Sequence, residues 1–392
     1  MLNADAEPPE AIRSYASSPT TVVVLFSEPL DSAEATVLSH YSADRGLTFT
    51  KAVCQPPLFD QVILETAFAM DTAQVYQLII TGIRDCGQNE AIDPSIIKTG
   101  LAVASPPGNC VINEILFDPG ANAYDYVEIY NHGPGLADAG AMYITNRNSL
   151  GQFNAPLLIS PEPYLIFPGD YVVITESAAV LSLNYLVRNP LNVLELGSLP
   201  SFPDDRGSVV LLDATGQLLD EVNYSRNWHF KLIDNPEGVS LERVDPLGSS
   251  ADPGNWHSAA STAGFGTPTY VNSQFKKQEE IGVQIKVIPP VFSPDNDGRD
   301  DITTLHYKTG EQGLVATIFI FDAAGRLVRN LVQNELLGDS GYWNWNGTDN
   351  ANQLLSVGIY IIQTELFNLV GNIKRIRSTV VLAKKLNFKK VL

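Results

Sequence analysis

The feature that most restricts the fold of this chain is its pattern of short alternating apolar and polar runs, each bounded by Gly, Pro, Asn or Asp. Such runs are typical of β-strands with one buried face, and the spacing of amphipathic helices is nearly absent over the 392 residues. One short helix is predicted over 31–40, with Asp31 or Ser32 capping its first turn. The clearest strands are predicted at 21–26, 61–64 and 76–80. The sequence therefore predicts an all-β protein.

Two β-hairpins can be predicted from their turns. The turn Asp213-Ala-Thr-Gly216 joins strands predicted at 208–212 and 218–222, and Asp322-Ala-Ala-Gly325 joins a second pair of strands. Aspartate suits the first position of a type I turn, and glycine accepts the positive φ that lets the return strand pair. The flanking strands differ in sequence, so the shared turn reflects turn chemistry and not an internal repeat.

The length and composition of the chain allow two or three packed domains. A chain of 392 residues exceeds the size at which one hydrophobic core stops growing. With 44% hydrophobic and 18% charged residues, the chain can fill such cores and is too apolar for wholesale disorder. Linkers are predicted at 104–108, where consecutive prolines cannot continue a central strand, and at the polar run 274–280. The predicted domains are 1–105, 108–274 and 281–386.

Acidic charge is concentrated in the first two-thirds of the chain. The formal net charge is -19, and residues 1–279 hold 33 acidic against 13 basic residues, while residues 280–392 hold 11 against 12. A surface this negative repels phosphate backbones, so nucleic-acid binding is not expected there. Cation binding and simple solubility both remain as explanations of the acidity.

Membrane and targeting signals are not visible in the sequence. No run of about 18 apolar residues exists, so no transmembrane helix is expected. Residues 1–5 carry neither a basic n-region nor an apolar h-region, so they do not read as a signal peptide.

Four segments between 108 and 274 carry the most specific motifs of the chain. They are Val-Ile-Asn-Glu-Ile-Leu at 111–116, Asp-Tyr-Val-Glu-Ile-Tyr-Asn at 125–131, Gly-Val-Ser-Leu-Glu-Arg at 238–243 and Asn-Trp-His-Ser-Ala-Ala at 255–260. In that order, with strands between them, they resemble a bacterial lamin-tail domain. The resemblance implies an immunoglobulin-like β-sandwich, a module normally carried as a passenger on larger surface or secreted proteins.

The segment before this region has a resemblance of its own. Residues 24–31, followed by Tyr41 and by 76–85, resemble the bacterial Ig-like domains of surface-layer and secreted proteins over about 8–104. The resemblance implies a second sandwich, placed before the lamin-tail region.

A third module begins at about Val283. The runs 292–301, 343–349 and 357–361, with the second Asp-Ala-x-Gly hairpin, resemble the Ig-like domain of flagellar hook-capping proteins. They also resemble the related C-terminal domains of Bacteroidota proteins exported by the type IX system. That family implies outer-membrane transit, with the terminal module as the address. The three resemblances together predict three tandem immunoglobulin-like β-sandwiches.

One acidic loop is a candidate calcium site. Asp295, Asp297, Asp300 and Asp301 lie within seven residues around Gly298. Calcium prefers six to eight oxygen ligands, which such a loop supplies, although the spacing does not fit the loop of an EF-hand. The alternative is a turn in which the carboxylates bond to backbone N–H groups. Melting with calcium and then with a chelator distinguishes the two, and calcium is the one cofactor that the sequence indicates.

Trp343 and Trp345 form the candidate ligand platform. They are two residues apart in a strand-like run, so both side chains face the same side of a sheet. If exposed, the two rings would form a stacking surface for a sugar or an aromatic partner. The alternative is that they pack in the core of the sandwich.

Three charged residues belong to the lamin-tail motifs. Glu114, Glu128 and Arg243 are predicted to form a partly buried network between strands, with the carboxylates paired to the guanidinium group. Metal ligation by the two glutamates is the alternative.

The three cysteines are Cys54, Cys86 and Cys110, and none forms a Cys-x-x-Cys pair. A disulfide between Cys54 and Cys86 would contribute roughly 3–4 kcal/mol in the chain-entropy model. Cys110 is a competing partner for Cys86, and three reduced thiols are the remaining alternative.

No catalytic motif accompanies these modules. The sequence has no Gly-x-Ser-x-Gly elbow and no glycine-rich phosphate loop, and its five histidines show no metal-ligand spacing. The sequence therefore predicts a protein that is not an enzyme.

The preferred function is that of a modular protein at the outer-membrane surface or outside the cell. It would act as a spacer, adhesion or interaction segment whose partner is a protein or glycan, with the C-terminal domain serving export or anchoring through the type IX machinery. Two alternatives remain: an accessory C-terminal portion of a larger secreted nuclease or hydrolase, and a calcium-dependent carbohydrate-binding adhesin.

Overall fold

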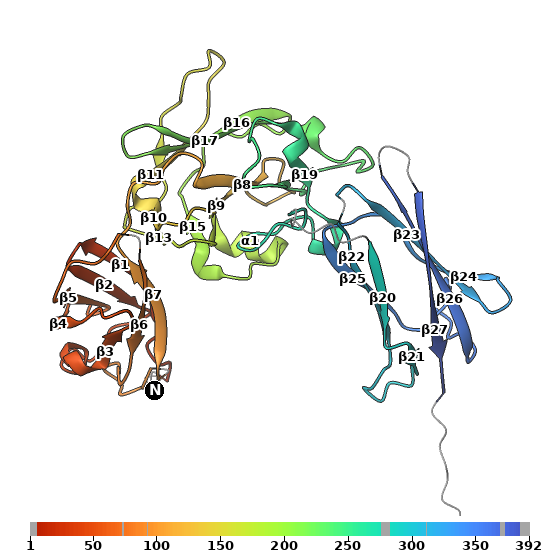
Figure 1. The fold of residues 1–392 in the computed structure, drawn as a ribbon, viewed down its shortest axis with the longest axis horizontal. Helices are drawn as coiled ribbons and strands as arrows, with labels where there is room; N and C mark the ends of the chain where they lie inside the picture. Colours follow the sequence, from red (N-terminus) through yellow and green to blue (C-terminus); the bar gives the residue numbers. More distant parts are fainter. Residues whose placement is uncertain are drawn as a thin grey trace, which may run out of the picture.

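The computed structural model describes residues 6–72, 74–91, 93–275, 283–310, 312–368 and 373–384. The first five residues, most of the predicted linker at 274–280 and the predicted end of the last domain at 386 lie outside the described residues. The fold is mostly β, and its sheets draw their strands from three successive stretches of the chain (Figure 1). We call these the first body (11–100), the second body (110–275) and the third body (284–382).

The first body is a sandwich of two antiparallel sheets, with the strand orders β1-β2-β5-β4 and β3-β6-β7. Alternate residues of β2, β5 and β6 point inward, and their apolar side chains fill the core between the sheets. The strands are β1 (Ala11–Ser18), β2 (Thr21–Phe26), β3 (Tyr41–Ala43), β4 (Phe49–Cys54), β5 (Gln61–Thr66), β6 (Val75–Ile80) and β7 (Ser95–Gly100).

The helix predicted over 31–40 is wrong in type. The structure has two short 3-10 helices there, η1 (Glu34–Thr36) and η2 (Leu38–His40). Asp31 caps the first turn as expected, because its Oδ1 accepts the N–H groups of Ala33 at 2.9 Å and Glu34 at 3.3 Å. The helix does not continue because Val37 is extended, with φ -74° and ψ 108°.

The second body packs a six-stranded sheet, β15-β14-β9-β8-β18-β19, against a four-stranded sheet, β12-β11-β16-β17. A two-stranded sheet, β10-β13, completes the body. The bounds are β8 (Cys110–Leu116), β9 (Tyr126–Asn131), β10 (Ala137–Asp138), η3 (Ala139–Ala141), β11 (Met142–Thr145), β12 (Leu157–Leu158), β13 (Leu165–Ile166), β14 (Tyr171–Thr175), α1 (Ala178–Asn184), η4 (Pro190–Asn192), β15 (Val193–Glu195), β16 (Arg206–Asp213), β17 (Leu218–Ser225), η5 (Arg226–Trp228), β18 (Leu241–Arg243), η6 (Pro253–Asn255), β19 (Trp256–Ser258) and η7 (Ser261–Ala263).

The outer face of the six-stranded sheet is covered as well. The helix α1 places Leu181 against Leu116, Tyr126 and Val173 of that face. Segment 264–275, which has no regular structure, also lies on this face and contacts β8, β9 and β18 through hydrogen bonds. We call it the covering segment. β8 is buried on both faces for this reason.

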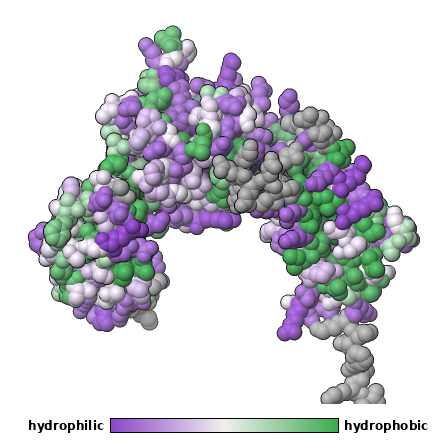
Figure 2. Space-filling view, in the orientation of Figure 1, coloured by the Kyte–Doolittle hydropathy of each residue, from purple (hydrophilic) through white to green (hydrophobic). Residues whose placement is uncertain are grey.

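The third body is a second two-sheet sandwich, with the strand orders β20-β22-β25 and β21-β27-β26-β23-β24. Its strands are β20 (Gln284–Ile288), β21 (Val291–Phe292), β22 (Thr303–Lys308), β23 (Val315–Asp322), β24 (Leu327–Leu336), β25 (Ser340–Trp345), β26 (Gly358–Phe367) and β27 (Ile373–Leu382). Apolar residues gather on the face of this body that is turned to the viewer in Figure 2.

Both hairpins predicted from Asp-Ala-x-Gly turns are confirmed. β16 pairs with β17 and β23 with β24, each across the predicted turn. Asp213 Oδ1 accepts the N–H groups of Thr215 and Gln217, both at 2.8 Å, and Gly216 has φ 80°. The second turn repeats this arrangement around Asp322.

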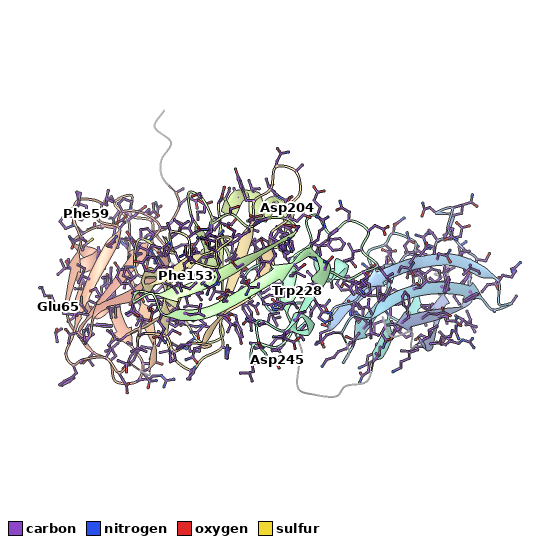
Figure 3. The ribbon with its side chains drawn as sticks, turned by 90° about the horizontal axis from the view of Figure 1, so that it is seen from above. Phe59, Glu65, Phe153, Asp204, Trp228 and Asp245 are labelled. Atoms are coloured by element: carbon purple, nitrogen blue, oxygen red, sulfur yellow. The ribbon has the colours of Figure 1, made fainter. Side chains whose placement is uncertain are left out.

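The three bodies form an arch in Figure 1, and Figure 3 shows them in a row when the molecule is seen from above. At the first joint, Arg13 donates to the carbonyl of Pro163 at 2.7 Å and pairs with Glu162 at 3.1 Å. At the second joint, Phe230 of the second body packs with Val315 and Leu336 of the third. Among the described residues, no helix has the length and apolar character needed to cross a membrane.

Candidate functional site

Three glutamates lie side by side on the six-stranded sheet and are completely buried. Glu128 of β9, Glu114 of β8 and Glu242 of β18 are direct neighbours across the strands, and each is 0% exposed. The register of β8 shifts between Ile112 and Glu114, so Ile112 and Ile115 both enter the core while Glu114 points to the outer face. We call these three residues the acidic row.

The carboxylate of Glu114 is surrounded by donors of the chain itself. Its Oε1 accepts the hydroxyl of Tyr126 at 2.6 Å, the N–H of Thr267 at 2.9 Å and the hydroxyl of Ser240. Its Oε2 lies 2.9 Å from Oγ1 of Thr267. A buried carboxylate with this many donors is compatible with a dry interior.

The other two glutamates bind the covering segment in the same way. Glu242 Oε2 accepts the hydroxyl of Ser273 at 2.8 Å and the N–H of Gln274 at 2.7 Å. Glu128 accepts the N–H of Thr269 at 2.6 Å and the side-chain amide of Asn113 at 2.8 Å. The acidic row therefore fastens the covering segment to the sheet.

Burial is the main electrostatic influence on the row, because it disfavours the charged form of a carboxyl group. Burial raises the pKa of Glu114, and burial together with the neighbouring Glu114 carboxylate raises the pKa of Glu128. The same two causes raise the pKa of Glu242 to about 8. Hydrogen bonds from the covering segment oppose these shifts.

The predicted network of Glu114 and Glu128 with Arg243 is wrong in its pairing. Arg243 is 1% exposed and pairs with Asp220 at 2.7 Å, and its Nε donates to the carbonyl of Ile112 at 2.7 Å. The reason is strand alternation, because Arg243 and Glu242 are consecutive in β18 and point to opposite faces. The glutamates occupy the outer face, and the guanidinium group lies on the inner side beside Trp256.

A pocket of about 430 Å³ opens beside the covering segment, between the second and third bodies. Thr267 and Tyr270 line it from one side, and Asp339 and Tyr342 line it from the other. The guanidinium carbon of Arg188 lies 4.2 Å from the centre of the Tyr270 ring at its wall. The pocket thus places a cation, a carboxylate and two aromatic rings around one opening.

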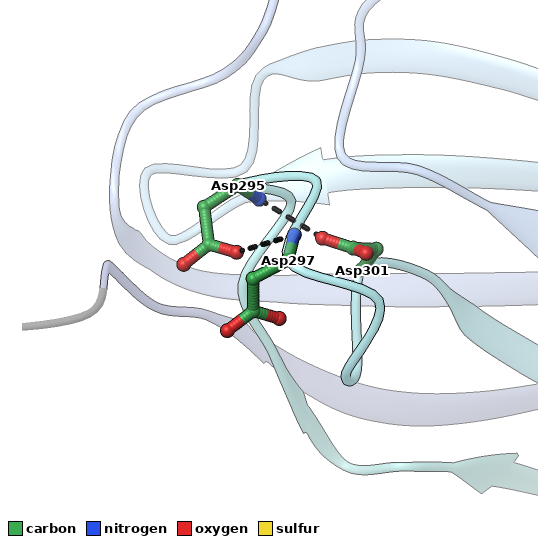
Figure 4. Close-up of side chains that lie close together, drawn as sticks. All are labelled: Asp295, Asp297 and Asp301. Carbon is green, nitrogen blue, oxygen red and sulfur yellow. Dashed lines mark hydrogen bonds between the residues drawn. The ribbon is translucent and has the colours of Figure 1, made fainter.

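The acidic loop of the third body gathers three of its four predicted carboxylates (Figure 4). Oxygens of Asp295, Asp297 and Asp301 lie within 4.8 Å of one another. Asp301 also accepts the N–H groups of Asp295, Asn296 and Gly298, as the turn alternative predicts. Asp300 does not belong to this group of three. These three side chains could hold a cation, and calcium stays a prediction.

Of the two alternatives for Trp343 and Trp345, packing in the core is confirmed and the exposed ligand platform is wrong. Both rings do face one side of β25, but that side is the core, and they are 7% and 1% exposed. Trp343 stacks on Tyr307 with the ring centres 4.6 Å apart, and Trp345 contacts Phe292 and Tyr360. The indole N–H of Trp343 donates to Glu335 and that of Trp345 to the carbonyl of Thr348.

The middle of the chain is similar to a known family. Residues 103–226 match the Lamin Tail Domain. The second body extends beyond the matched residues, because β18 pairs with β8 and β19 pairs with β18. The acidic row thus joins two strands of the matched region to one strand outside it.

Solved structures with some similarity to this chain include three bacterial proteins. The N-terminal part of the S-layer protein SbsC is 15% identical over 43% of this chain and 40% of its own, with a TM-score of 0.24. A DUF4876 family protein from Bacteroides thetaiotaomicron is 13% identical over 56% and 88%, with a TM-score of 0.26. Dimeric latent PorU from Porphyromonas gingivalis is 11% identical over 96% and 33%, with a TM-score of 0.22.

The alignment thus spans less than half of the SbsC fragment. No curated protein matches the sequence of this chain.

The possible disulfide between Cys54 and Cys86 is not formed. Cys54, Cys86 and Cys110 are all free thiols; Cys86 is exposed and the other two are buried. The sulfur of Cys54 lies 3.6 Å from the carbonyl of Phe59, and that of Cys86 lies 3.6 Å from the carbonyl of Leu30. The structure therefore agrees with the alternative of three reduced thiols.

A second group of acids in the second body was not predicted from the sequence. Burial, together with the charges of Asp204, Glu176 and Asp118, raises the pKa of Asp125 to about 7. Asp118 pairs with Arg226 at 2.5 Å. These acids come from separate loops, so their spacing in the sequence gave no signal. Glu242 was also missed, although it lies beside Arg243 in a motif and alternation could have placed it opposite that residue.

Proposed function

We propose that this chain is a non-catalytic structural segment that holds three β-sandwich bodies in a fixed arch. The observation that carries the proposal is the second joint, which combines apolar and polar contacts. Phe230 packs against Val315 and Leu336, and the side-chain amide of Gln274 donates to the carbonyl of Leu337 at 3.2 Å. The N–H of Asp339 also donates to the carbonyl of Ser273 at 2.7 Å. A joint with a buried apolar centre and paired polar groups resists bending.

The setting that we propose is the cell surface or the medium. The support is the resemblance of the flanking segments to Ig-like domains of surface-layer proteins and to C-terminal domains of proteins exported by the type IX system. In that setting the arch acts as a spacer or interaction segment for a protein or glycan. The third body then serves export or anchoring.

Solution scattering tests the fixed arch. The whole chain is expected to give one distance distribution that matches the arch of Figure 1. Phe230→Asp should broaden that distribution, because a buried charge opposes packing at the second joint. Leu232→Asp is the matched control, since Leu232 is 53% exposed in the same loop and should have no effect. A wild-type distribution as broad as that of Phe230→Asp would contradict the proposal.

Export is tested separately in a bacterium that has a type IX system. The chain is placed behind a cleavable signal peptide, with and without residues 283–392, and surface exposure is measured by protease treatment of whole cells. The chain that keeps the third body is expected at the surface, and the shortened chain is expected to stay in the periplasm. Equal exposure of the two would remove the export role and leave the arch untouched.

A further inference from the structure

The hydroxyl group of Thr267 lies between two carboxyl groups of the acidic row. Oγ1 of Thr267 is 2.9 Å from Glu114 Oε2 and 2.9 Å from Glu242 Oε1. Both are hydrogen-bond distances, and all three residues are buried. A threonine hydroxyl carries one proton, and an ionised carboxylate is only an acceptor. Two ionised carboxylates would therefore leave one of these contacts without a proton.

The surrounding donors indicate which carboxyl group carries the additional proton. Glu114 Oε1 already accepts three donors, from Tyr126, Ser240 and the backbone of Thr267, and this arrangement suits an ionised carboxylate. Oε2 of Glu242 accepts hydrogen bonds from Ser273 and Gln274, whereas its Oε1 contacts the hydroxyl of Thr267. The proton then lies on Glu242 Oε1 and is donated to Thr267, whose own hydroxyl donates to Glu114.

We propose that Glu242 carries a structural proton at neutral pH, and that the resulting chain from Glu242 through Thr267 to Glu114 is a latch on the second joint. The bonds formed are O–H···O bonds only, and no covalent step is involved. The residues that the latch fastens, Ser273 and Gln274, are the ones that bond to Asp339 and Leu337 of the third body. The role of this hydrogen-bonded chain as a latch depends on the proposed arch, whereas the protonation of Glu242 does not.

Among the residues that the structure describes, the groups that face the row supply no compensating positive charge. Tyr126, Tyr185, Tyr171 and Tyr270 approach it from β9, the end of α1, β14 and the covering segment, and burial raises the pKa of each, so all four are neutral at pH 7. His257 of β19 is the neighbour of Glu242 across the strands, and burial lowers its pKa. Two charged groups lie further out: Arg188 stacks on Tyr270 and Asp339 lines the pocket beyond it.

The direction of the pH effect follows from linkage. An unfolded glutamate has a pKa near 4.5, and the buried Glu242 has a pKa of about 8. Below pH 4.5 Glu242 is protonated both when the covering segment is bound to the sheet (the closed state) and when it is detached (the opened state), so the closed state has its full stability. Between these two pKa values Glu242 keeps its proton only in the closed state. The equilibrium constant for closing of the covering segment therefore falls about tenfold per pH unit. Above about pH 8 both states are ionised and the loss is complete.

Infrared spectroscopy of the whole chain tests the proton. A protonated carboxyl has its own C=O band, and the spectrum at pH 6 minus that at pH 9 should contain the band of Glu242. The Asp125→Asn background removes one further carboxyl, whose pKa is raised to about 7. In that background, Glu242→Gln should remove one carboxyl from the difference band, and Glu237→Gln, at an exposed position, should leave it unchanged. An absent band in the parent protein, or an unchanged band in Glu242→Gln, would overturn the proposal.

Hydrogen exchange tests the latch. The backbone amides of Thr267 and Gln274 should lose protection between pH 5.5 and 7.5, by about a hundredfold after correction for base catalysis. Glu242→Gln should abolish that pH dependence, because its amide donates to Thr267 at every pH. If the band is present and the protection does not change with pH, the proton exists but is no latch, and the arch is untouched. If scattering shows a flexible chain while the infrared band of Glu242 remains, the fixed arch is contradicted and the proton on Glu242 is not.

Discussion

Replacing Arg243 with alanine is expected to lower the free energy of unfolding of the second body by about 3–5 kcal/mol. The guanidinium group is 1% exposed, donates to Asp220 and Ser250 at 2.7 and 2.5 Å, and reaches the carbonyl of Ile112. Without it, the Asp220 carboxylate remains largely buried without its cation, and the carbonyl of Ile112 loses a donor. A domain is stable by about 5–15 kcal/mol, so this loss is a large fraction of the total.

Urea unfolding followed by tryptophan fluorescence measures this loss, because Trp228 and Trp256 lie in the same domain. Arg206→Ala is the matched control: its side chain is 82% exposed and its ion pair with Asp205 spans 3.8 Å, so a change below about 0.5 kcal/mol is expected. The double variant Arg243→Ala with Asp220→Ala should recover part of the loss, since the unpaired charge is gone. A loss below about 1 kcal/mol in Arg243→Ala would mean that the pair is hydrated and not buried.

The parts of the fold that could be predicted are those set by neighbours in the sequence. The turns at Asp213 and Asp322 form from hydrogen bonds within four residues, so their sequence alone determines the hairpins. Strand alternation in β2, β5 and β6 is likewise local, and the strands predicted there are confirmed. The helix α1 was missed because seven residues with one buried side chain, Leu181, give no measurable period.

The acidic row shows what sequence reasoning could not reach. The motif around Glu114 indicates that this residue is a candidate, but its partner Thr267 lies 153 residues away, in a segment with no regular structure. Nothing in the local pattern indicates that this segment returns to cover the sheet. The pairing of Arg243 could have been predicted correctly, because Leu241 in the same strand faces the core and alternation places Arg243 on that side.

Strand alternation predicts only part of the environment of Trp345. Its spacing from Trp343 correctly predicts that the two rings share a face of β25. Which face meets the opposite sheet depends on the register of β22 and β25 and on the strands that pack across the core. Those contacts join distant parts of the chain, so the choice between core and platform required the structure.

Replacing Trp345 with alanine is expected to lower the free energy of unfolding of the third body by about 3–5 kcal/mol. The ring is 1% exposed and lies 5.3 Å from the ring centres of both Phe292 and Tyr360, so its removal leaves a cavity in the core. The indole N–H also donates to the carbonyl of Thr348 at 3.0 Å, which loses its partner. Calorimetry of the whole chain should show the transition of the third body at a lower temperature.

Tyr342→Ala is the matched control for this prediction, because Tyr342 lies in the same strand and is 60% exposed. Its removal should change the free energy of unfolding by less than about 0.5 kcal/mol. If Trp345→Ala were as stable as Tyr342→Ala while losing binding to a glycan, the ring would be a ligand platform after all. A core residue gives the opposite combination, in which stability falls and any glycan binding disappears only as the third body unfolds.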